Sequence, residues 1–173
     1  VRLRRVLPGF SVLDFKREAA SLFDCVGDAL ARADERALAR LTTPSCHKPM
    51  AASLRARPRG EEPSWAVSGI TASIKQARVG HNASNKDIHY AQLTCAIDAQ
   101  VIWEIRRKGE RVGGVGNAEL PHALCDYWVM ERCLSDDPQV AASSAWKLKM
   151  RLGDVAAADK GVWWRQQAQK GGG

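Results

Sequence analysis

The first third of the chain repeats its apolar residues at steps of three and four. From residue 15 to residue 41 these positions form one series, and most positions between them carry Asp, Glu, Lys or Arg. Such steps place side chains on one face of a helix. The pattern therefore predicts an amphipathic helix or a helix pair, the second helix starting near Asp34. Ser11 or Asp14 is the expected first N-cap, and Pro44 ends the pair because a residue before proline avoids helical geometry.

The rest of the chain alternates apolar and polar residues with period two, which is typical of half-buried strands. A short helix is expected first, within residues 45–58, followed by a Pro- and Gly-containing loop. Residues 107–111 contain the expected hairpin turn, Lys108-Gly109-Glu110-Arg111, and residues 98–100 interrupt the alternation as a β-bulge does. Strands are expected at 65–79 (one or two strands), 88–106, 112–120, 124–134 and 146–152.

The order of these elements predicts the fold class. Helices come first and strands follow, so we expect an α+β domain with N-terminal helices packed in a strongly curved antiparallel sheet of about four strands. Residues 1–10 form a basic N-terminal arm, residues 11–152 the domain, and residues 153–173 a C-terminal tail.

Composition and charge limit the function classes. Hydrophobic residues make up 45% of the chain, enough for a substantial core, and no run of about 18 apolar residues suggests a membrane-spanning helix. The net charge is +7, and a basic protein favours contact with nucleic acid or anionic lipid. The alternative is an ordinary basic protein whose charges only face solvent.

The basic residues gather in four places, and these are the candidate contacts to RNA or lipid. Because alternate residues of a strand share one face, the last group is expected to form a basic stripe. The groups are Arg2, Arg4 and Arg5 in the arm; Arg55 and Arg57; Arg106, Arg107, Lys108 and Arg111 at the hairpin; and Lys147, Lys149 and Arg151 on the last strand.

Two adjacent aromatic residues, Trp163 and Trp164, stand beside Arg165 in the tail. An exposed aromatic pair is typical of an interface anchor, so we expect Trp163 and Trp164 to hold a partner. The alternative is that the pair caps the domain's own core.

Motifs for chemistry are weak. The five cysteines have no CxxC spacing and the four histidines no HxxxH spacing, so neither a zinc site nor a disulfide framework is expected. In the run Gly113-Gly114-Val115-Gly116, a dinucleotide loop would need a further glycine at position 119, which is Glu, and a helix after it. The run is therefore interpreted as one strand of a glycine-rich hairpin. We therefore expect no enzymatic activity, no cofactor, no metal and no small-molecule substrate.

Several short motifs, in order over residues 13–152, resemble one known family. The chain has a helix-opening Phe15-Lys16-Arg17-Glu18-Ala19, a small-Asp-x-x-x-Leu segment at 33–38, and a Leu-Thr-Thr-Pro stop at 41–44. It ends with Tyr127-Trp128-Val129-Met130-Glu131-Arg132 and Trp146-Lys147-Leu148, where Met130 replaces a usual aromatic residue. Together these motifs resemble the Tim44-like domain, and most of all the mitochondrial large-ribosomal-subunit protein of the L-forty-five type.

The resemblance implies a cone-shaped fold, cystatin-like or nuclear-transport-factor-like, with an apolar hollow. It implies a structural component of the mitochondrial large ribosomal subunit that docks ribosomal RNA and neighbouring ribosomal proteins near the polypeptide exit, in the matrix and peripheral to the inner membrane. The alternatives are the matrix-side anchor of the protein-import motor and an accessory subunit of another inner-membrane complex. An inward carboxylate could act as a general base in such a cone, but we expect Asp98 and Asp126 to point outward.

Overall fold

The computed structural model describes residues 7, 9–81, 88–134 and 144–153. Its elements are the helices α2 (Val12–Ala31), α3 (Glu35–Leu41) and α4 (Pro44–Arg55) and the strands β1 (Glu61–His81), β2 (His89–Arg107), β3 (Glu110–Val115), β4 (His122–Leu134) and β5 (Lys147–Gly153). The α+β prediction is confirmed.

The expected helix pair is confirmed, and its capping residues explain its limits. The Ser11 side chain accepts a hydrogen bond from the Asp14 backbone N–H at 3.2 Å, so Ser11 rather than Asp14 caps α2. The chain then breaks at Ala33, whose φ of 55° lies outside helical values. Asp34 caps α3 by accepting from the Ala37 N–H at 2.9 Å.

The third helix, α4, begins with Pro44 at its first turn, where a proline costs no intrahelical hydrogen bond. It therefore starts one residue before the expected range of 45–58 and ends at Arg55. A second proline, Pro49, lies inside it and removes one backbone donor.

The strands form one antiparallel sheet in the order β1-β2-β4-β5, and β3 pairs with the end of β2 beyond β4. The β-bulge predicted at residues 98–100 of β2 lies instead on the facing strand, β1. Ser68 pairs with Gln100 and Thr71 with Asp98, so two residues of β1 face one residue of β2. Gly69 takes φ of 62° there, a conformation that glycine adopts without strain.

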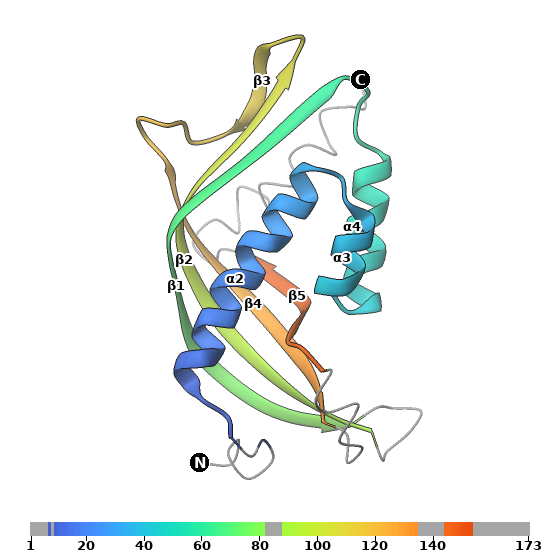
Figure 1. Ribbon diagram of the computed structural model, residues 1–173, viewed down its shortest axis with the longest axis vertical. Coiled ribbons are helices and arrows are strands. Elements are labelled where there is room, and N and C mark those ends of the chain that lie inside the picture. The colour runs from blue at the N-terminus through green and yellow to red at the C-terminus, as the bar shows by residue number, and fades with distance from the viewer. Residues whose placement is uncertain (1–6, 8, 82–87, 135–143, 154–173) are drawn as a thin grey trace.

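The curved sheet wraps around α2, while α3 and α4 lie beside that helix (Figure 1). Interlocked aromatic side chains fill the concave side. Phe23 packs on Trp65 and Trp128, with ring centroids 5.7 and 5.0 Å away, and Phe15 packs edge-on against Trp146 at 4.9 Å. The described part of the expected hollow is thus occupied by the domain's own core.

One contact ties the helices to the far edge of the sheet. The Thr43 N–H donates to the Leu148 carbonyl at 2.9 Å, and Thr42 forms a parallel bridge with the same residue. The segment between α3 and α4 therefore extends the sheet beyond β5.

Gly113 and Gly114 of the glycine run lie in β3, the second strand of a hairpin, as predicted. Gly114 has φ of 117°, and a Cβ there would lie 1.8 Å from the Trp103 carbonyl oxygen. Only glycine allows β3 to pass so close to β2. The run serves strand pairing and does not form a phosphate loop.

Candidate basic docking surface

The positive charge of the described chain is concentrated in one segment. Residues 32–59 carry seven Lys or Arg residues against two Asp or Glu residues, whereas the other described residues carry twelve of each sign. This segment comprises α3, α4 and the turns that flank them. We call it the α3–α4 surface. Among the described residues the excess positive charge is therefore largest on the α3–α4 surface, whereas α2 is net acidic and the sheet carries only a small basic excess.

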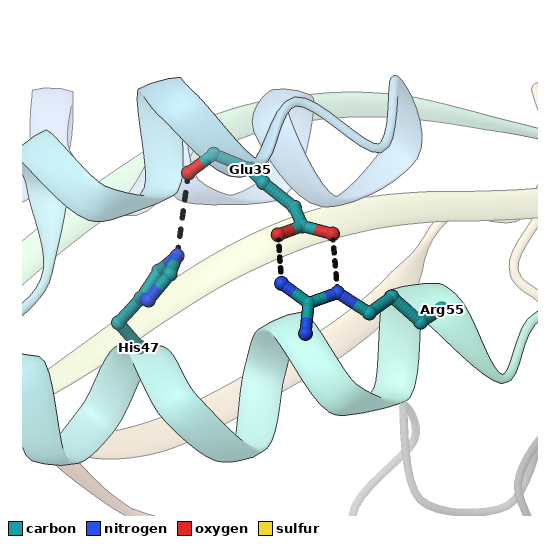
Figure 2. Close-up of polar contacts among 3 residues, drawn as sticks. All are labelled: Glu35, His47 and Arg55. Atoms are coloured by element: carbon teal, nitrogen blue, oxygen red, sulfur yellow. Dashed lines mark hydrogen bonds and ion pairs between the residues drawn. The ribbon is translucent and has the colours of Figure 1, made fainter.

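The two acidic residues of this surface are already engaged within it. Asp34 caps α3, and Glu35 binds the Arg55 guanidinium through two hydrogen bonds, of 3.0 and 2.7 Å (Figure 2). His47 of α4 contacts the Glu35 backbone carbonyl at 3.3 Å. The hydrogen bond from Arg55 lowers the pKa of Glu35. These contacts hold α3 against α4.

Two cations that the sequence predicted as phosphate contacts thus have structural roles. Arg55 is the partner of Glu35. Arg57 donates to the carbonyls of Ala31 and Leu30, at 3.1 and 2.5 Å, which are among the last acceptors of α2. Burial lowers the pKa of Arg57. A guanidinium at this end also complements the helix dipole.

Five other cations of this surface face solvent and were not among the predicted contacts: Arg32, Arg36, Arg40, Lys48 and Arg59. Arg32 is paired with Asp28 at 2.7 Å. No described residue forms an ion pair with Arg36, Arg40 or Lys48. Arg36 and Arg40 stand four residues apart on α3, a spacing that places them on one face and that could have identified them from the sequence.

The hairpin cluster is gathered as predicted, but two of its four cations have acidic partners. Arg106 bonds to Glu104 and to the Gly109 carbonyl, and Arg107 bonds to Glu61 at 2.8 Å. The side chain of Arg111 donates to a backbone carbonyl, Gly116, at 2.8 Å. Lys108 is exposed at the tip. Acidic partners therefore reduce the field that this cluster presents to an anion.

The predicted basic stripe on β5 is wrong. Lys149 and Leu152 are extra residues opposite β4, so the alternation of faces along β5 is broken twice. The side chain of Arg151 consequently turns inward and is only 4% exposed. Lys149 bonds to Glu131 at 2.7 Å. One of the three cations is in the core and a second is neutralised.

The expectation that Asp126 points outward is also wrong, whereas Asp98 is exposed as expected. Asp126 lies on the inner face of β4 and accepts from Arg151 Nε at 2.9 Å and from Trp128 Nε1 at 2.8 Å. Its buried Oδ1 accepts no hydrogen bond in the described structure. Burial lowers the pKa of Arg151 to about 10. The geometry is that of a buried ion pair joining β4 to β5.

Other predicted contacts lie beyond this description. Arg2, Arg4, Arg5, Trp163 and Trp164 are outside the described residues. Within the described ranges, no three His, Cys, Asp or Glu side chains are grouped as metal ligands. No helix among those residues is both long and apolar enough to cross a bilayer.

The comparison with protein families agrees with this architecture. A family model described as the Tim44-like domain matches residues 2–150. The chain belongs to the Tim44-like domain family. No curated protein matches it. Membership is consistent with a membrane-associated role in mitochondria, and it confirms the family that the helix-stop and strand motifs indicated.

Proposed function

We propose that this Tim44-like domain is a non-catalytic docking component of the mitochondrial large ribosomal subunit. In this role it holds ribosomal RNA and neighbouring ribosomal proteins near the polypeptide exit, in the matrix and beside the inner membrane. The observation that carries the proposal is the concentration of uncompensated cations on the α3–α4 surface.

Arg36, Arg40 and Lys48 are exposed and have no acidic partner among the described residues. Such cations bind phosphates without reading base sequence, and they displace condensed counter-ions when they do so. This chemistry suits the dense phosphate backbone of a ribosome. The packed interior supports a docking role as well, because Phe23, Trp65 and Trp128 occupy the side of the sheet where a substrate cavity would otherwise be expected.

The test is sedimentation of the tagged full-length protein from a mitochondrial lysate over a series of salt concentrations. We expect co-migration with the large ribosomal subunit that weakens as salt rises. The double variant Arg36→Glu, Arg40→Glu should dissociate at lower salt, and the salt slope should fall by about 0.7–0.9 for each phosphate that the variant no longer binds.

The matched control is Lys16→Glu, Lys75→Glu, which reverses two exposed cations on α2 and β1. It changes the net charge by the same amount and should co-migrate like the unaltered protein. Equal weakening in both variants would indicate a general charge effect and contradict the assignment to α3–α4. Migration with import-motor or other inner-membrane complexes would overturn the ribosomal proposal.

A further inference from the structure

A surface cavity of about 370 Å³ adjoins the α3–α4 surface at the start of α4. Thr43, Pro44 and Ser45 form one wall, and the outer face of the sheet forms the other. Polar side chains line it. The sheet residues that line it are Gly80, His81, Tyr90, Gln92, Glu131 and Lys149.

The side chains that line the cavity on the sheet form a hydrogen-bonded network. Gln92 lies opposite Glu131 in the ladder between β2 and β4. Glu131 is buried, and its Oε2 accepts both from Gln92 Nε2 and from Lys149 Nζ, each at 2.7 Å. Oε1 of Glu131 and the amide oxygen of Gln92 accept no hydrogen bond from a described residue. These two oxygens are acceptors available to a ligand that carries a donor.

Tyr90 adds an aromatic surface two residues before Gln92, on the same face of β2. It is half-buried and lines the cavity. The described tryptophans and phenylalanines contact one another in the core, whereas Tyr90 contacts no aromatic ring of the described structure. An aromatic side chain of this kind is a stacking surface for a nucleobase.

We propose that this cavity binds one unpaired nucleotide of an RNA, with the base against Tyr90 and an exocyclic amino group directed to Glu131 and Gln92. Lys149, whose side chain is 32% exposed, and the cations of the adjoining α3–α4 surface supply positive charge for the neighbouring phosphates. The amino group of cytosine, adenine or guanine has two donor hydrogens, whereas uracil has no amino group and offers a single ring N–H, so the two acceptors favour the amino-bearing bases. The proposal deepens the docking role and rests on RNA being the partner.

The test is titration of the full-length protein with 5′-CMP, 5′-UMP and inorganic phosphate, followed by NMR. We expect saturable binding of CMP, weaker binding of UMP and the weakest binding of phosphate. Tyr90→Ala should weaken CMP binding about ten-fold, as expected when one base–aromatic stack is removed. The control is Tyr127→Ala, the other described tyrosine, which is also half-buried but lies outside the cavity; it should leave binding unchanged.

Glu131→Gln should reduce the preference for CMP over UMP while retaining part of the stacking affinity. Equal binding of CMP, UMP and phosphate by the unaltered protein would overturn the proposal, and this comparison needs no variant to fold. Absence of saturable binding up to about 10 mM, well above the range that stacking plus two hydrogen bonds supports, would overturn it too.

The two proposals fail separately. Nucleotide binding without ribosomal co-migration would retain this site and remove the ribosomal assignment. Ribosomal co-migration without CMP binding would retain the docking role and remove the nucleotide site.

Discussion

Gly27 of α2 packs directly against the Trp65 ring of β1. A Cβ at this position would lie 2.2 Å from Cε2 of the Trp65 ring, and the Trp65 indole is held by a 2.9 Å hydrogen bond to Asp24. Alanine gains about 0.5–1 kcal/mol over glycine inside a helix, but overpacking typically costs about 1–3 kcal/mol. We therefore expect Gly27→Ala to lower the free energy of unfolding by about 1 kcal/mol, measured by urea denaturation.

The control is Gly80→Ala, because a Cβ at Gly80 meets no atom within 4 Å and its φ is not positive. That substitution should leave stability unchanged or raise it by up to about 1 kcal/mol. An unchanged or raised stability of Gly27→Ala would mean that the indole moves aside at little cost.

The ion pair of Asp126 and Arg151 gives a second prediction at this scale. Both side chains are almost fully buried, so Asp126→Ala leaves a guanidinium in the core without its counter-ion, which costs about 3–5 kcal/mol. Replacing both residues, as Asp126→Leu with Arg151→Met, removes the unpaired charge and should recover most of this stability. Urea denaturation of Asp126→Leu, Arg151→Met and the double variant measures the coupling, and additive effects would contradict it.

The sequence pattern indicates the face on which Asp126 lies but not its partner, Arg151. Period two places Asp126 on the same face as Trp128 and Met130, but a carboxylate is seldom buried without a partner, which favoured the outward interpretation. The partner was hidden because the extra residue Lys149 reverses the alternation along β5. A bulge of this kind has no reliable signal in one sequence.

At the scale of elements, the contact between α3 and α4 depends on pH. Arg55 lowers the folded-state pKa of Glu35 below the ordinary value of 4.5. A carboxyl group with a lowered folded-state pKa contributes stability above its unfolded pKa and loses it as pH falls through the folded pKa. Glu35→Gln should therefore lower Tm near neutral pH, and the difference from the unaltered protein should vanish on acidification below 4.5. A constant difference in Tm would assign the effect to packing.

The helices and strands themselves were largely predictable. Steps of three and four identified α2 and α3, and alternation identified β2 and β4, because one face of each meets the core. The bulge in β1 had an available signal in Gly69, since glycine inside a strand often marks one. The cavity beside α4 could not be predicted, because it depends on how residues 43–45 meet the outer face of the sheet.

At the scale of the whole molecule, the sequence predicted the amount of charge but not its distribution. Arg106 and Arg107 are adjacent in the chain and yet meet Glu104 and Glu61 in the fold. Arg36 and Lys48 are apart in the chain and lie on two helices, α3 and α4, that the Glu35–Arg55 pair joins. Cross-strand neighbours decide which cations remain uncompensated, and they are known only once the register is known.

The reactivity of the cysteine thiols should differ with their burial in the fold. Cys25 is exposed, whereas burial raises the pKa of Cys46 to about 11 and that of Cys95 to about 12. Because the thiolate is the reactive form, iodoacetamide at neutral pH should modify Cys25 in the native protein and reach Cys46 and Cys95 only on unfolding. Peptide mass spectrometry resolves the sites, and rapid native modification of Cys95 would contradict the register of β2.

The bond between Thr43 and Leu148 has a kinetic consequence. It joins segments far apart in the sequence, whereas β1 and β2 are neighbours in a hairpin. Contacts between distant segments carry a larger loop-closure entropy and slow the folding of a domain. We therefore expect the hairpin to form early and the edge at β5 to close late. Since that edge connects the sheet to the start of α4, the α3–α4 surface and the cavity beside it would be the last parts of the domain to mature after synthesis.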